Sequence, residues 1–100
     1  MVPGSRLASD MDAGRIEALL LEDKADEVIA TLEGMKASGE KPGDRLLYLL
    51  GNAYRKKGDW KGAMENYLEA VELNPESPAA AALQMAGDIM AFYNKDLYNP

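Results

Sequence analysis

Residues 44–75, DRLLYLLGNAYRKKGDWKGAMENYLEAVELNP, decide the fold of this chain. Apolar side chains recur every three or four positions over 44–57 and again over 60–73, which predicts two amphipathic helices. Between them lies Gly58-Asp59, where the glycine can end one helix and the aspartate can cap the next. Because this turn is short, the two segments are expected to lie side by side as an antiparallel helical hairpin.

The apolar faces of this hairpin combine large and small side chains. Gly51 lies on the same helical face as Leu47, Leu50 and Tyr54. A glycine inside a helix costs about 1 kcal/mol relative to alanine, so its place on the apolar face needs a reason. The facing stripe of the second helix also carries small residues, Ala63 and Ala70. The pattern therefore predicts that the two helices approach each other closely at Gly51.

Further helical segments are expected on both sides of the hairpin. Turn-like residues at 39–44 and 74–78 separate them, and the helices expected outside the hairpin are 11–22, 24–38 and 78–94. Ser77 before Pro78 is a typical helix start, and Asp23 and Asp44 are expected to cap the second and third helices. Since no segment shows a strand pattern, the sequence predicts an all-α protein.

The central stretch resembles one full tetratricopeptide repeat, a helix–turn–helix unit of about 34 residues. The resemblance runs through Leu47, Leu50, Gly51, Tyr54, Ala63, Tyr67, Ala70 and Pro75. It implies an α-α superhelix of two helix–turn–helix repeats plus a C-terminal capping helix. The ending FYNKDLYNP is similar to that of short stand-alone bacterial members of the family.

The same resemblance divides the chain into segments. Residues 1–10 are expected to be a flexible leader, and the sequence leaves open whether they are native. Residues 11–100 are expected to form one domain: a degenerate repeat at 11–43, the full repeat at 44–77, a capping helix at 78–94 and a tail at 95–100. A shift of 35 positions from the full repeat places Met85 of the capping helix opposite Leu50.

The family implies a function in protein–protein interaction. Its members hold an extended peptide or a partner's helix in a concave groove lined by the first helix of each repeat. The resemblance therefore implies an adaptor or scaffold. On the face of the third helix opposite its core stripe, and on the last helix, the groove candidates are Arg45, Tyr48, Asn52, Arg55, Lys56 and Leu83, with Gly87 and Met90 at equivalent places.

One subclass of the family clamps the C-terminal carboxylate of heat-shock chaperones with two asparagines and several basic residues. Asn52 fits one of the asparagines, but Tyr48 stands where a lysine is expected. Leu83 and Gly87 supply neither an amide nor a positive charge. Docking of that type is therefore not expected.

A second interpretation starts from the last helix, whose apolar residues cover more than one stripe. A helix that is apolar on two sides is buried on two sides. The cover could be the tail NKDLYNP, a peptide ligand or a second copy of the chain, and a second copy would make the protein a self-associating module that dimerises through this helix. The apolar residues are Ala79, Ala82, Leu83, Met85, Ala86, Ile89, Met90, Phe92 and Tyr93.

Composition argues against several other classes of function. The formal net charge is −6, which disfavours nucleic acid and anionic membrane as partners. The chain has no cysteine and no histidine, so the usual zinc ligands and the usual general base are missing. We therefore expect no enzyme activity, no cofactor and no metal site. No apolar run reaches the roughly 18 residues of a membrane span, and residues 1–10 lack the hydrophobic stretch of a secretory signal, so a cytoplasmic location is expected. Acidic pairs fall at caps and on polar faces, where carboxylates are ordinary: Glu22-Asp23, Asp26-Glu27, and Glu69 with Glu72.

Overall fold

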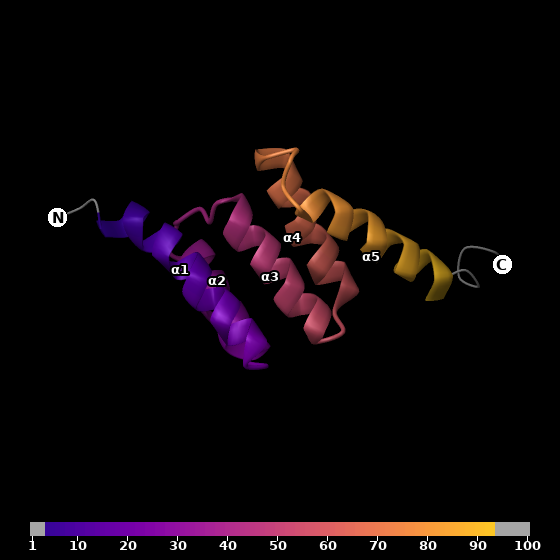
Figure 1. Ribbon diagram of the computed structural model, residues 1–100, viewed down its shortest axis with the longest axis horizontal. Helices are drawn as coiled ribbons and strands as arrows, with labels where there is room; N and C mark the ends of the chain where they lie inside the picture. The colour runs from indigo at the N-terminus through magenta and orange to yellow at the C-terminus, as the bar shows by residue number, and fades with distance from the viewer. Residues whose placement is uncertain (1–3, 94–100) are drawn as a thin grey trace.

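The computed structural model describes residues 4–93, with side chains over 13–89 and at 91, and contains only helices in that range. Their bounds are α1 Gly4–Leu21, α2 Ala25–Ala37, α3 Asp44–Lys56, α4 Trp60–Leu73 and α5 Ala79–Tyr93 (Figure 1). The pairs α1–α2 and α3–α4 form two helical hairpins, and α5 follows as a single helix. The predicted all-α fold of two repeats and a capping helix is confirmed.

The helices are arranged in a row, with α1 and α2 at one end and α5 at the other (Figure 1). The molecule is elongated, measuring 57 × 27 × 22 Å. In this row α3 packs against α1, α2 and α4, while α5 packs mainly against α4. As a result, α3 is the central helix of the domain and joins its two halves.

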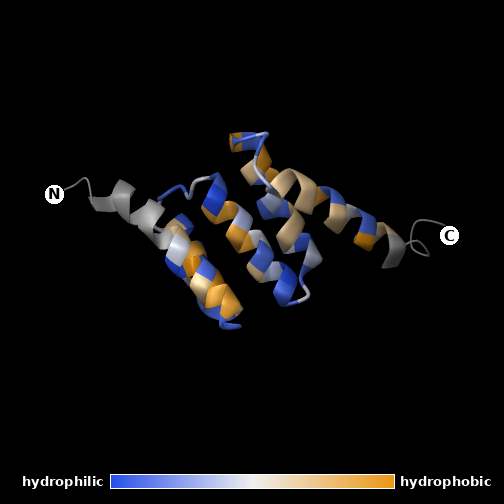
Figure 2. Cartoon of the chain, in the orientation of Figure 1, coloured by the Kyte–Doolittle hydropathy of each residue, from blue (hydrophilic) through white to orange (hydrophobic). Residues whose placement is uncertain are grey.

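The hydrophobic core consists of two clusters that meet at α3. One cluster lies among α1, α2 and α3, and its α3 residues are Leu46, Leu49, Leu50 and Ala53. The other lies among α3, α4 and α5 and includes Leu47 of α3. In Figure 2 the turns between the helices are mostly hydrophilic. Because six residues of α3 are buried on two sides of the helix, this helix carries packing from both repeats.

The two helices of the central hairpin approach most closely at Gly51. A Cβ atom on this residue would lie 2.5 Å from two ring carbons of Tyr67 and 3.1 Å from the carbonyl oxygen of Ala63. The Tyr67 side chain is fully buried. The close approach predicted from the sequence is confirmed, and the Cδ1 and Cε1 atoms of the Tyr67 ring occupy the space that a side chain at position 51 would need.

The helix ends confirm some of the expected caps. Gly58 has φ +84°, the left-handed conformation that ends α3, and the carboxylate of Asp59 accepts a hydrogen bond from the Gly62 N–H at 2.9 Å. The Ser77 hydroxyl accepts from the Ala79 N–H at 3.0 Å. These contacts satisfy amide groups that have no partner inside the helix.

Two expected caps are wrong. Gly43, and not Asp44, is the cap residue of α3, and the Asp44 carboxylate instead accepts a hydrogen bond from Asn74 at 3.2 Å. Lys24, and not Asp23, precedes α2, because Asp23 lies in the preceding turn with φ 66°. In both places the cap residue lies one position away from the residue that the sequence pattern favours.

The first helix begins at Gly4, earlier than the expected start at Met11. Residues 5–10 contain neither proline nor glycine, so no residue there interrupts the helix. The expected leader at 1–10 overlaps this helix, and residues 1–3 lie outside the described residues, as do the tail at 95–100 and Asn94. The division of the chain into leader, repeats, capping helix and tail stays a prediction.

The contact at Gly51 leads to a prediction about stability. Gly51→Ala should lower the free energy of unfolding by roughly 1–3 kcal/mol, because the new methyl group overlaps the Tyr67 ring. Gly34→Ala is the matched control, since a Cβ there meets nothing within 4 Å and alanine favours a helix by up to about 1 kcal/mol. Urea denaturation of the two variants measures both changes, and a stabilising Gly51→Ala would contradict the packing described.

Candidate functional site

One side of α3 carries most of the residues that the sequence predicted for the groove. Tyr48, Asn52 and Arg55 follow one another at spacings of four and three, so they share a helical face. All three are partly buried, whereas Arg45 and Lys56 at the two ends of this face are exposed. The structure thus places five of the six predicted residues on a single helix face. Of the candidates on α5, Leu83 is discussed below, and the side chain of Met90 lies outside the described residues.

The side chain of Tyr67, in α4, contacts this face of α3 through its hydroxyl group. Its ring passes Gly51, and its hydroxyl donates a hydrogen bond to the Oδ1 atom of Asn52. The Tyr48 ring lies beside it, with the two ring centroids 6.0 Å apart and the planes tilted by 37°. Such a tilted pair is a favourable arrangement of aromatic rings. Tyr48 and Asn52 are therefore both held in place by a buried residue of the next helix.

The Tyr67 hydroxyl stays protonated, which lets it act as the hydrogen-bond donor to Asn52. Burial raises the pKa of the Tyr67 hydroxyl above its ordinary value of 10.0, while the nearby guanidinium group of Arg55 acts in the opposite direction. The hydroxyl is therefore a neutral donor at physiological pH. Because the Asn52 Oδ1 atom accepts this hydrogen bond, the amide nitrogen with its two donors is the part of Asn52 that can serve a ligand.

The positive side chains along this face differ in their partners. Arg45 pairs with Glu17 of α1 at 3.8 Å, and Lys56 pairs with Asp23 at 3.9 Å. Both pairs are solvent-exposed, and such pairs contribute at most about 1 kcal/mol. None of the ion pairs found among the described residues involves Arg55. Arg55 is thus the cation of this face that has no carboxylate partner within the described part of the chain.

The side chains that α5 buries differ from those expected from the shift of 35 positions. Met85 was aligned with the buried Leu50, but 48% of its surface is exposed. The buried residues of α5 are Ala79, Ala82 and Ala86, whose spacing of three and then four repeats that of Leu46, Leu49 and Ala53 in α3.

This repetition changes which residues of the two helices correspond. The shift between them becomes 33 positions, so Ala81, Met85 and Asp88 take the places that Tyr48, Asn52 and Arg55 hold in α3. Leu83 is partly buried and packs against the core cluster of α4 and α5.

The part that sequence reasoning missed is the hydroxyl group of Tyr67. Tyr67 is one of the positions that carry the repeat resemblance, and its ring is buried. A buried tyrosine, unlike phenylalanine, needs a hydrogen-bond partner for its hydroxyl, and this requirement was the available signal. No described buried side-chain nitrogen or oxygen lacks a partner.

Other kinds of site are not found in the described residues. The described part of the chain contains no cluster of three or more acidic side chains placed to hold a metal ion. Over the same range, no helix has the length and the apolar character that crossing a lipid bilayer requires.

Comparisons with known proteins agree with the helical-repeat fold. A family model described as "TPR repeat" matches residues 51–81. The solution NMR structure of the Bacteroides fragilis protein BF1650 is similar, with 44% sequence identity, a TM-score of 0.69, and coverage of 87% of this chain and 88% of that one. No curated protein matches the chain.

The chain therefore belongs to the tetratricopeptide-repeat family, and its similarity to BF1650 covers most of both chains. Repeats of this family generally mediate protein–protein interaction. They are typically not enzymes.

The contact between Tyr67 and Asn52 can be tested by a double-mutant cycle. Asn52→Ala should cost about 1–3 kcal/mol of unfolding free energy, because the buried hydroxyl loses its acceptor. Adding Tyr67→Phe removes that hydroxyl and should recover part of the loss, giving a coupling of about 1 kcal/mol in urea denaturation. Fully additive costs would mean that the two groups do not interact.

Proposed function

We propose that the protein is an interaction adaptor that holds a peptide or a partner's helix along the face of α3 that carries Tyr48, Asn52 and Arg55. The observation that carries this proposal is that Tyr67 holds two of these side chains, Asn52 through its hydroxyl and Tyr48 through its ring. Side chains held in place before binding lose less conformational entropy when a ligand arrives, so more of the contact energy appears as affinity.

Each residue of this face has a distinct role in the proposal. The Asn52 amide nitrogen donates to a backbone carbonyl of the ligand, and the Arg55 guanidinium binds a carboxylate. The Tyr48 ring supplies apolar contact. Arg45 and Lys56 add positive charge at the two ends, since their exposed pairs with Glu17 and Asp23 open readily.

On α5 the proposal includes Leu83, together with Met85 as the more exposed apolar contact. Leu83 packs partly against the core, so its free surface is the smaller of the two. A ligand that spans α3 and α5 would therefore combine polar contacts on the first helix with apolar contacts on the second.

The partner in this proposal is a protein or peptide, without nucleic acid, membrane or cofactor, and the location is cytoplasmic. The net charge of −6 supports the first part, because phosphate-rich partners require clustered positive charge.

Self-association through α5 is the second candidate. It is favoured by the exposure of large apolar side chains on α4 and α5, where Leu68 and Met85 are each 48% exposed. In a row of repeats, the open side of a terminal helix is where a further helix would pack. A second copy could supply that cover.

A photo-crosslinking experiment tests the adaptor proposal. A photoreactive amino acid replaces Tyr48 in one variant and Ala30, exposed on α2, in the control, and both proteins are irradiated in lysate of the source cells. We expect an adduct with another protein from position 48 only. Adding Arg55→Glu should reduce this adduct at least about fivefold, while the same charge change in Lys24→Glu should leave it unchanged.

Two outcomes would contradict the adaptor proposal. Equal adducts from positions 48 and 30 would show that the face of α3 has no preference for a partner. An adduct with twice the mass of the chain, insensitive to Arg55→Glu, would instead support self-association.

A further inference from the structure

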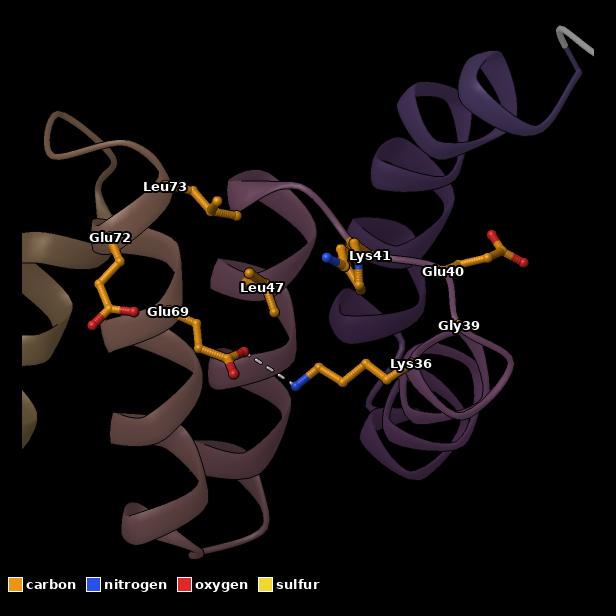
Figure 3. A pocket seen from close by; sticks show the side chains of 9 residues that line it. Lys36, Gly39, Glu40, Lys41, Leu47, Glu69, Glu72 and Leu73 are labelled. Atoms are coloured by element: carbon orange, nitrogen blue, oxygen red, sulfur yellow. Dashed lines mark hydrogen bonds and ion pairs between the residues drawn. The ribbon is translucent and has the colours of Figure 1, made fainter.

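A recess runs along the side of α3 that lies opposite Tyr48, Asn52 and Arg55. The helices α2 and α4 both pack against α3 but not closely against each other. A pocket of about 450 Å³ opens between α4 and the connection from α2 to α3. Figure 3 shows that Lys36 and the 39–41 segment line one side, Glu69, Glu72 and Leu73 line the other, and Leu47 lies between them.

A second pocket of about 390 Å³ continues this recess toward the other end of the helices. It is lined by side chains of α2, α3 and α4, including Glu33, Tyr54 and Asn66, and it shares Lys36 and Glu69 with the first pocket. We call the two pockets together the α2/α4 trough. By helical spacing, its floor residues Leu47 and Tyr54 lie on the side of α3 away from Asn52.

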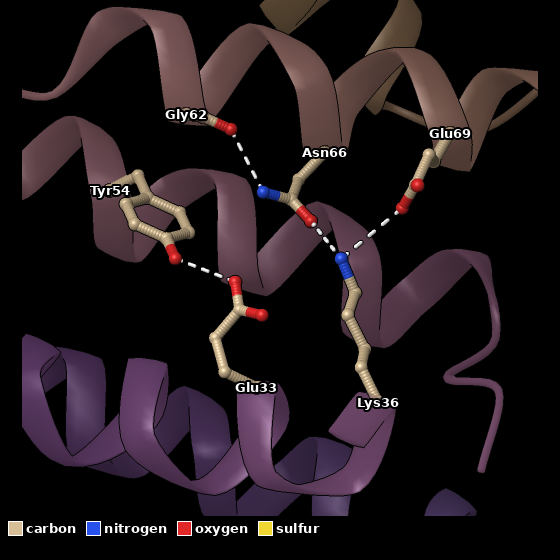
Figure 4. Close-up of polar contacts among 6 residues, drawn as sticks. All are labelled: Glu33, Lys36, Tyr54, Gly62, Asn66 and Glu69. Carbon is tan, nitrogen blue, oxygen red and sulfur yellow. Dashed lines mark hydrogen bonds and ion pairs between the residues drawn. The ribbon is translucent and has the colours of Figure 1, made fainter. Parts of the chain in front are cut away.

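Lys36 crosses the trough between its two halves. Its Nζ atom donates to the Asn66 Oδ1 atom at 2.9 Å and lies 3.3 Å from a carboxylate oxygen of Glu69 (Figure 4). Asn66 is oriented for this contact because its amide nitrogen donates to the Gly62 carbonyl at 2.8 Å. An ammonium group thus already sits in a carboxamide–carboxylate site that is part of the trough.

A second polar contact joins two of the helices that line the trough. The Tyr54 hydroxyl donates to the Glu33 carboxylate at 2.6 Å, so it ties α3 to α2 beside Lys36 (Figure 4). Burial and this carboxylate raise the pKa of Tyr54 to about 12, which keeps the hydroxyl a donor at physiological pH. Figure 4 shows Glu33 and Lys36 extending side by side from α2.

The trough combines negative charge with an apolar floor and wall. Six carboxylates and three lysines line the two pockets, a formal net charge of −3. The first pocket adds apolar surface from the buried Leu47 and Pro42 and from Leu73, which is 61% exposed. The carboxylates are Glu33, Glu40, Asp59, Glu65, Glu69 and Glu72.

We infer that the α2/α4 trough binds a basic peptide segment, with an apolar side chain of the peptide against Leu47 and Leu73 and its Arg or Lys side chains at the surrounding carboxylates. Charge complementarity selects this occupant, because an acidic peptide would meet the net negative charge. The inference does not depend on the groove proposed above, since the trough uses none of the groove residues.

The position of Lys36 gives this inference a distinctive consequence. A cationic side chain of the peptide competes with Lys36 for the Asn66 and Glu69 oxygens. Removing the charge of Lys36 should therefore strengthen binding of the peptide. If Lys36 were only a structural bridge, its removal would weaken peptide binding or leave it unchanged. Lys36→Met keeps most of the aliphatic stem and removes the charge.

The test uses a fluorescent peptide that alternates arginine with leucine and follows its anisotropy during titration with the protein. The pair Glu69→Gln with Glu72→Gln should weaken binding about tenfold. The matched control, Glu22→Gln with Glu27→Gln, changes the net charge equally at exposed carboxylates outside the trough and should change binding less than about twofold. Lys36→Met should strengthen peptide binding about threefold or more.

The apolar contact has its own matched pair of variants. Leu73→Ser should weaken binding, while Leu21→Ser, at a leucine that is 86% exposed outside the trough, should not. Amide chemical shifts recorded during the titration should change around Asn66 and Leu73.

Three results would overturn the inference. Equal losses from the two glutamate pairs would reduce the binding to general charge attraction. Shifts confined to Tyr48, Asn52 and Arg55 would place the peptide in the groove. Equal binding of a peptide that alternates glutamate with leucine would remove the charge selection.

Discussion

The packing of the Tyr67 ring on Gly51 is the contact on which the rest of the structure depends. It sets the distance between α3 and α4, because any side chain at position 51 would overlap the ring. It also fixes where the hydroxyl emerges, beside Asn52 and next to the Tyr48 ring. One buried residue therefore joins the hairpin core to the surface that we propose as the groove.

The central helix α3 has two accessible sides of different chemistry. On the groove side its residues include the cations Arg45, Arg55 and Lys56, which suit carboxylates. On the trough side the surroundings are mainly acidic, with Lys36 held internally by Asn66 and Glu69. Opposite charge preferences on two sides of one helix would let a small repeat protein hold two different segments at once, as a scaffold does.

Much of the fold could be predicted from sequence because helix periodicity and turn residues are local signals. The Gly58-Asp59 turn and the glycine on the apolar face of α3 led directly to the observed hairpin. The errors arise where contacts distant in sequence decide the outcome: the Asp44 carboxylate accepts a hydrogen bond from Asn74, 30 positions away, and Gly43 is the cap residue of α3. Met85 does not correspond to Leu50, because α5 buries the stripe that matches Leu46, Leu49 and Ala53 of α3 at a shift of 33 positions.

The candidate sites were less predictable because they depend on contacts between helices. Helical spacing alone placed Tyr48, Asn52 and Arg55 on one face. It could not show that Tyr67 reaches Asn52 from α4, or that Lys36 reaches Asn66 from α2. Both are contacts of polar groups at the ends of long side chains, and their partners depend on how closely the helices pack.

The most direct test of the account is an NMR measurement of nuclear Overhauser contacts in the folded protein. We expect strong contacts between the ring protons of Tyr67 and the α-protons of Gly51, and weaker ones between the rings of Tyr67 and Tyr48. The chemical shifts of the Gly51 α-protons should also change when Tyr67 is replaced by leucine, because the ring current of the aromatic ring is then lost. A Tyr67 ring without contacts to Gly51 would contradict the packing of the hairpin and, with it, the proposed arrangement of the groove.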